Sequence, residues 1–149
     1  MSESGSDDVW GTAVDARWNV TDCFGVMAEV WRGQGLGTYN GAILQMLNPT
    51  TLHSVPSTGG FCELFLYWTP CLHTHVGYGI DDPLDRDIDA DPAALGRVYN
   101  STIYSNVLWD LNPAFRVGFE FTCRVTDYKA GVLPDNEGAG FHTQLQWAF

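Results

Sequence analysis

Seven stretches of the sequence alternate apolar and polar side chains with a period of two, which is the pattern of a β-strand with two unlike faces. They cover residues 9–20, 22–33, 60–69, 71–80, 97–111, 113–127 and 139–149. In the last stretch Phe141, Thr143, Leu145, Trp147 and Phe149 fall on one side, opposite His142, Gln144, Gln146 and Ala148. So many alternating stretches predict an all-β chain.

Short and long connections alternate between these strands. The short ones contain turn-forming residues and are Val20-Thr-Asp-Cys23, Trp68-Thr-Pro-Cys71 and Leu111-Asn-Pro-Ala114. The long ones lie near residues 34–59, 81–96 and 128–138. This order predicts an antiparallel up-and-down meander of about seven strands over residues 9–149, after a polar tail at residues 1–8.

Each predicted strand has one apolar and one polar face. The alternation is clearest at residues 113–127, where Phe115, Phe119 and Phe121 share a side opposite Arg116 and Glu120. The residues assigned to the polar face are Asp15, Arg17, Glu29, Glu63, His73, His75, Arg116, Glu120, Arg124, His142, Gln144 and Gln146.

Four of the six tryptophans occupy equivalent places. Trp18, Trp68, Trp109 and Trp147 lie near the ends of alternate strands, each beside a short connection or the end of the chain, and each on the apolar side. A Trp ring prefers the boundary between membrane and water, because the ring is apolar and its N–H still needs a partner. A row of Trp at one level is therefore typical of a membrane-interface girdle.

Composition excludes two classes of protein. The formal net charge is −11 with only seven Lys and Arg, which argues against a nucleic-acid-binding surface. No apolar run reaches the roughly 18–20 residues of a transmembrane helix. Residues 1–8 lack the basic region and apolar core of a signal peptide, which indicates either a cytoplasmic protein or the C-terminal part of a longer exported one.

The terminal Phe149, the alternating strands, the unequal connections and the Trp row together resemble a bacterial outer-membrane porin-type β-barrel. The resemblance implies passive diffusion of small polar solutes, with no enzymatic activity and no cofactor. It implies that the polar-face residues line a lumen, and that outer-membrane lipids and the barrel-assembly machinery, through the C-terminal strand, are partners. The membrane-interface residues would be Trp18, Trp68, Trp109, Trp147 and Phe149.

Two features depart from that family. There is no signal sequence, and seven strands cannot form the even-numbered closed barrel usual for bacterial single chains. We therefore expect the C-terminal portion of a larger barrel in the outer membrane of a Gram-negative-type bacterium, unless copies assemble into a homo-oligomer to close it.

Two other functions remain open on the sequence. One is a soluble antiparallel β-barrel that binds a small ligand, with its aromatic face turned inward. The other is a metal-dependent enzyme, because His73 and His75 share one strand face and Glu63 lies on the neighbouring strand. The acidic ligand expected shortly after such a pair is missing, and the nearest downstream carboxylate is Asp81. The preferred interpretation is no metal.

Three further patterns have simpler interpretations. The four cysteines have no spacing typical of a metal site. A disulfide between Cys23 and Cys71 is geometrically conceivable, but four small apolar residues, buried or facing lipid, are preferred. The aspartate-rich loop at residues 81–91 is interpreted as a solvated acidic loop rather than a calcium site. The apolar run Gly41–Leu47 either folds into a lumen or packs under its own loop.

Overall fold

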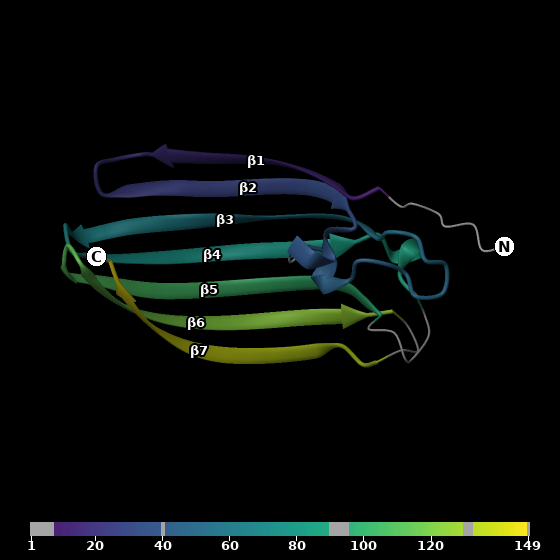
Figure 1. Cartoon of the computed structure of the whole chain (residues 1–149). Helices are drawn as coiled ribbons and strands as arrows, with labels where there is room; N and C mark the ends of the chain where they lie inside the picture. The colour runs from purple at the N-terminus through teal and green to yellow at the C-terminus, as the bar shows by residue number, and fades with distance from the viewer. Residues whose placement is uncertain (1–7, 40, 90–95, 130–132, 149) are drawn as a thin grey trace.

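The computed structural model describes residues 8–39, 41–89, 96–129 and 133–148. Seven antiparallel strands form one sheet in the order of the sequence, with the short turns at one end and the long connections at the other (Figure 1). The strands are β1 (Trp10–Asn19), β2 (Phe24–Gln34), β3 (Pro56–Thr69), β4 (Leu72–Pro83), β5 (Arg97–Asn112), β6 (Phe115–Tyr128) and β7 (Asn136–Trp147). The predicted seven-strand antiparallel meander is confirmed.

The strand ends differ from the sequence prediction mainly at two prolines. Pro56 and Pro83 were assigned to long loops, but they are the first residue of β3 and the last residue of β4. Proline lacks the N–H that a strand interior needs and is tolerated at a strand end. The sheet therefore extends further toward the long connections than the prediction placed it. Phe149 and most of the predicted tail at residues 1–8 lie outside the described residues.

Each of the three short turns is stabilised by hydrogen bonds from its own backbone to one of its side chains. The Oγ1 of Thr21 and of Thr69 each accepts from the backbone N–H groups two and three residues ahead, at 3.3 and 3.0 Å. In the third turn Asn112 Oδ1 accepts from the N–H of Ala114 at 2.9 Å. These side chains satisfy backbone donors that the turn leaves free, which explains why Thr and Asn mark the three reversals.

The sheet is open. β1 and β7 are its two edges, and no described residue of one strand pairs with the other. The seven strands do not close into a barrel by themselves, as we expected from their odd number. Among the described residues no helix is long and apolar enough to cross a membrane.

The segment between β2 and β3 folds back over one face of the sheet, in front of β4 and β5 (Figure 1). It contains the short 3₁₀ turns η1 (Leu36–Tyr39) and η2 (Ala42–Leu44). Ile43 donates its N–H to the Asp81 carboxylate at 2.7 Å, and the Arg97 guanidinium donates to the Ile43 carbonyl at 3.0 Å. The apolar run at residues 41–47 is therefore fixed on the sheet at its long-connection end.

Backbone strain is concentrated in this segment. Ala42, Ile43 and Leu44 have φ of 52°, 48° and 65°, in the left-handed region that costs an L-residue about 1–2 kcal/mol. The side chains of Ala42 and Ile43 are buried, and Ala42 packs with Val55 and Ile88 in a small core. The bonds to the sheet and this packing hold the strained turn in place.

A third 3₁₀ turn, η3 (Asp85–Asp87), follows β4.

Candidate functional site

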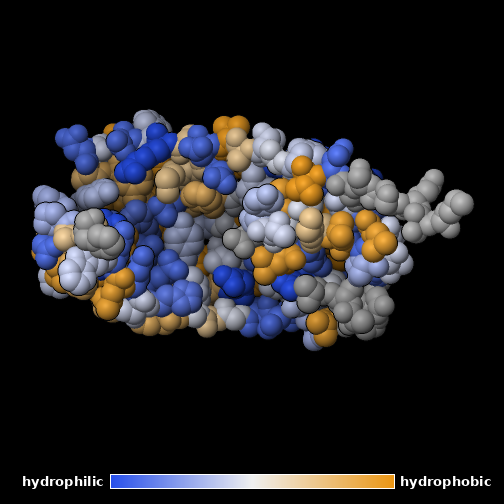
Figure 2. All heavy atoms as spheres, viewed as in Figure 1, coloured by the Kyte–Doolittle hydropathy of each residue, from blue (hydrophilic) through white to orange (hydrophobic). Residues whose placement is uncertain are grey.

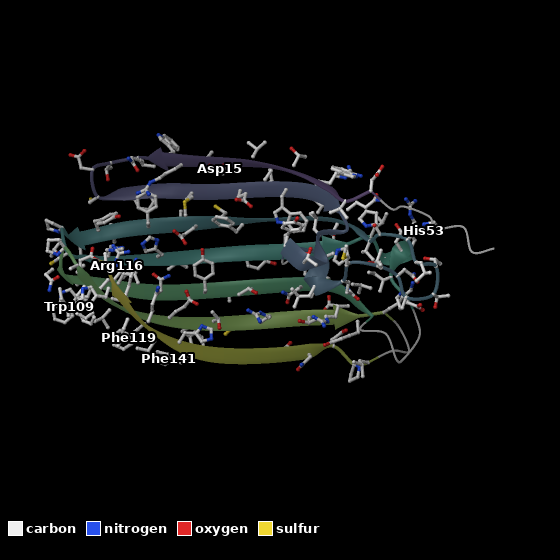
Figure 3. All side chains as sticks on the ribbon, viewed as in Figure 1. Asp15, His53, Trp109, Arg116, Phe119 and Phe141 are labelled. Carbon is white, nitrogen blue, oxygen red and sulfur yellow. The ribbon has the colours of Figure 1, made fainter. Side chains whose placement is uncertain are left out.

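The strand registers place all twelve residues assigned to the polar face on one side of the sheet, which we call the polar face. Asp15 lies opposite Glu29, and Glu120 lies opposite His142. The face is hollowed and lined by hydrophilic side chains between the turn end and the segment over β4 and β5 (Figure 2). Arg116 lies on this side, whereas Phe119 and Phe141 lie on the other (Figure 3).

The opposite side, which we call the apolar face, is the more exposed one. The four tryptophans near the turn end lie on it, with exposed fractions of 67% for Trp18, 62% for Trp68, 52% for Trp109 and 74% for Trp147. On the polar face, by contrast, Glu63 is 7% and His73 3% exposed. In the middle of the sheet the sheltered side is thus the polar side, the reverse of an ordinary soluble β-sheet packed on an apolar core. The edge strands β1 and β7 are exposed on both faces.

Six polar-face residues from β3, β4, β5 and β6 form one connected group, which we call the histidine cluster. Its members are Glu63, His73, His75, Tyr104, Asp110 and Arg116. One carboxylate begins it: Glu63 Oε2 accepts from the Tyr104 hydroxyl at 2.6 Å, and Glu63 Oε1 lies 2.6 Å from His75 Nδ1. His75 Nε2 then lies 2.8 Å from His73 Nδ1.

A second carboxylate ends the cluster. His73 Nε2 faces Asp110 Oδ2 at 3.6 Å, which is beyond hydrogen-bond distance. Arg116 holds Asp110 with two bonds, from Nε at 2.5 Å and from the terminal nitrogen at 3.2 Å. Tyr67 stacks on the His73 ring with centroids 4.7 Å apart. The cluster therefore runs from the middle of the sheet to the turn end, with a charged group at each end.

Gly77 makes the first contact of the cluster geometrically feasible. Glu63 pairs with Gly77 and Gly77 pairs with Tyr104, so β4 separates the acid from the phenol. A Cβ on Gly77 would collide with the Tyr104 ring. Because glycine has no side chain, the ring lies across β4 and its hydroxyl reaches the carboxylate two strands away.

Gly77→Ala is expected to lower the free energy of unfolding by about 1–3 kcal/mol, because the added methyl displaces Tyr104 from Glu63. Denaturant unfolding of the refolded protein measures the change. Gly138→Ala is the matched control, since a Cβ there meets nothing within 4 Å, and its effect should stay within about 0.5 kcal/mol. Equal losses for both variants would contradict this role of Gly77.

The other polar-face residues are more loosely connected. Glu120 lies 3.4 Å from His142 Nδ1 and accepts from Asn106 at 3.4 Å. The Arg17 guanidinium lies over the Phe65 ring, 4.4 Å from its centroid. The remaining predicted residues share the face without joining the histidine cluster; they are Asp15, Glu29, Arg124, Gln144 and Gln146.

Sequence reasoning singled out Glu63, His73, His75 and Arg116 but did not include Tyr104 among the polar-face residues. Its position in the strand was the available signal. Tyr104 lies two residues from both Thr102 and Asn106, so all three side chains lie on the same side of β5. An aromatic residue reads as apolar in an alternation pattern, so the pattern alone did not distinguish it.

The geometry does not favour the two-histidine metal site. His73 and His75 direct nitrogens at each other, rather than at a common third position. Within the described part of the chain, no three or more His, Cys, Asp or Glu side chains are grouped so that they could hold a metal. All four cysteines have free thiols, so the Cys23–Cys71 disulfide is not formed.

Comparison with known proteins identifies no relative. No protein-family model matches the chain, and neither a curated protein nor a solved structure matches it. The chain is therefore assigned by its architecture alone, as an all-β protein with an open seven-strand antiparallel meander.

Proposed function

We propose that this chain forms part of the wall of an outer-membrane β-barrel, through which small polar solutes diffuse passively. One observation carries the proposal: in the middle of the sheet the apolar face is exposed while the polar face is sheltered, as at Glu63 and His73. Monomeric soluble proteins rarely expose a continuous apolar surface of this kind, whereas a lipid bilayer covers it.

The distribution of charge on the apolar face supports the membrane interpretation. By register, Arg32, Asp82, Asp127 and Glu137 lie on that face, and each is within three residues of the strand end that meets a long connection. The band between these charges and the tryptophans is uncharged in the described strands. The strands contain 10 to 16 residues, and crossing a bilayer needs roughly 9–11.

The exposed aromatic side also separates this proposal from a ligand-binding soluble barrel. That alternative requires the aromatic face to line an interior cavity. Here Trp18, Trp68, Trp109 and Trp147 lie on the exposed side, at the level expected for an interface girdle.

Closure requires strands beyond these seven. An open edge in lipid leaves backbone N–H and C=O groups without partners, at a cost of several kcal/mol each. β1 and β7 run in the same direction, because strand direction alternates along the seven-strand sheet. Two like-oriented copies would place β1 beside β7 in parallel, so an odd number of further strands from a longer protein closes an antiparallel barrel. The free edge of β7 is the part that the barrel-assembly machinery would engage.

Planar-bilayer conductance tests the pore. We expect discrete, ohmic steps from the complete product of the gene, because its closed barrel encloses the polar face. The 149-residue chain alone should give no stable steps, since the sheet it forms is open. Heat-modifiable migration on gels provides the control that each sample has folded. A folded complete product that never conducts would contradict the proposal.

A further inference from the structure

We propose that Glu63, His75, His73 and Asp110 form a site that binds one proton in common. The proposal concerns the chemistry of these side chains and does not depend on the pore. It follows from comparing the number of N–H protons on the two imidazoles with the number of contacts that need one. The contacts are Glu63–His75 at 2.6 Å, His75–His73 at 2.8 Å and His73–Asp110 at 3.6 Å.

With both carboxylates ionised and both imidazoles neutral, two protons are available for three contacts, because a neutral imidazole carries one N–H. A carboxylate only accepts, so His75 Nδ1 must donate to Glu63. His75 Nε2 is then an acceptor, and His73 Nδ1 must donate to it. His73 Nε2 is left as a bare acceptor facing the Asp110 carboxylate.

The geometry agrees with this count. The one contact left without a proton is the long one, and His73 Nε2 is a buried nitrogen with no hydrogen-bond partner. His73 itself is 3% exposed, so water does not readily supply the missing bond. A buried polar atom without a partner costs about 1–3 kcal/mol.

One added proton on His73 Nε2 completes the series, because that nitrogen then donates to Asp110. The cluster cannot accommodate a second added proton. It would make both rings imidazolium and direct two N–H groups at each other across 2.8 Å. The two histidines should therefore take up one proton between them, where two independent histidines would take up two.

The surrounding groups determine the charge of the site. Strand β3 contributes Glu63 and Tyr67, whose ring stacks on His73. Strand β5 contributes Asp110 and Tyr104, whose hydroxyl binds Glu63. From β6 comes Arg116, which opposes the added proton while it holds Asp110. Two carboxylates and one guanidinium give the cluster a formal charge of −1, and the shared proton makes it neutral.

Imidazole ¹⁵N NMR on the refolded full chain tests the count from pH 8 down to about 4. The range extends below that of an ordinary histidine because burial, His75 and Arg116 lower the pKa of His73. We expect the summed proton uptake of His73 and His75 to be one, in a single shared step. His142 is the internal reference for signal assignment, since its ring is exposed and lies outside the histidine cluster. A sum of two, or of zero, would overturn the proposal.

Asp110→Asn tests the same point chemically. An amide at position 110 can donate N–H to His73 Nε2, so the third contact is filled without an added proton. The shared uptake should then disappear over the same pH range, whereas His142→Gln should leave it unchanged. Persistence of the step in Asp110→Asn would refute the site. The proton count on the unmodified chain needs neither variant to fold.

Discussion

Phe141→Arg is expected to lower the free energy of unfolding from phospholipid vesicles by about 2–4 kcal/mol, the cost of an arginine facing lipid near the midplane. Phe141 lies in the middle of β7, on the apolar face, and is 67% exposed. In the proposed barrel that exposed surface contacts lipid chains, and arginine must leave water to occupy it. Reversible denaturant unfolding of the complete gene product in vesicles measures the loss.

The adjacent residue provides the control. His142→Arg introduces the same side chain one position along the strand, on the polar face and beside Glu120, 3.4 Å from the native ring. Its effect should be below about 1 kcal/mol, because the new charge stays hydrated and gains a carboxylate partner. If Phe141→Arg is equally mild, or increases stability, the apolar face does not contact lipid and the membrane proposal fails.

Glu63→Ala is expected to lower the free energy of unfolding by about 3–5 kcal/mol. Glu63 is 7% exposed and is the common partner of His75 and Tyr104, each at 2.6 Å. Removing the carboxylate leaves a buried imidazole N–H and a buried hydroxyl without their acceptor, at about 1–3 kcal/mol each. Denaturant unfolding compares the variant with the unmodified protein.

Glu120→Ala is the matched comparison for this prediction. Glu120 has the same chemistry on the same face, but its contacts to His142 and Asn106 are 3.4 Å long and its side chain is 35% exposed. Its removal should cost less than about 1 kcal/mol. A double-mutant cycle of Glu63→Ala with Tyr104→Phe should show coupling, and additive losses would contradict the direct bond.

The number and order of the strands were predictable from the sequence because each rests on local chemistry. Period-two alternation defines a strand and its two faces within a few residues, and Thr21, Thr69 and Asn112 mark the reversals through bonds made two or three residues away. The prediction was less accurate at Pro56 and Pro83, where a residue that usually breaks strands instead lies at a strand end.

The histidine cluster was only partly predictable. Alternation placed Glu63, His73 and His75 on one face, but it does not say which polar side chains touch. Tyr104 reaches Glu63 only because the strand register places Gly77 between them. Register depends on pairing between residues far apart in the chain, so the local pattern of any one strand does not contain it.

The sequence by itself therefore determined an all-β meander with one apolar and one polar face, because side-chain direction in a strand alternates with each residue. Only the tertiary structure decided which face is sheltered, which side chains join the histidine cluster, and that the sheet stays open. These features depend on the curvature of the whole sheet and on contacts between strands. The position of Ile43 was likewise decided by a long-range contact, its hydrogen bond to Asp81 of β4.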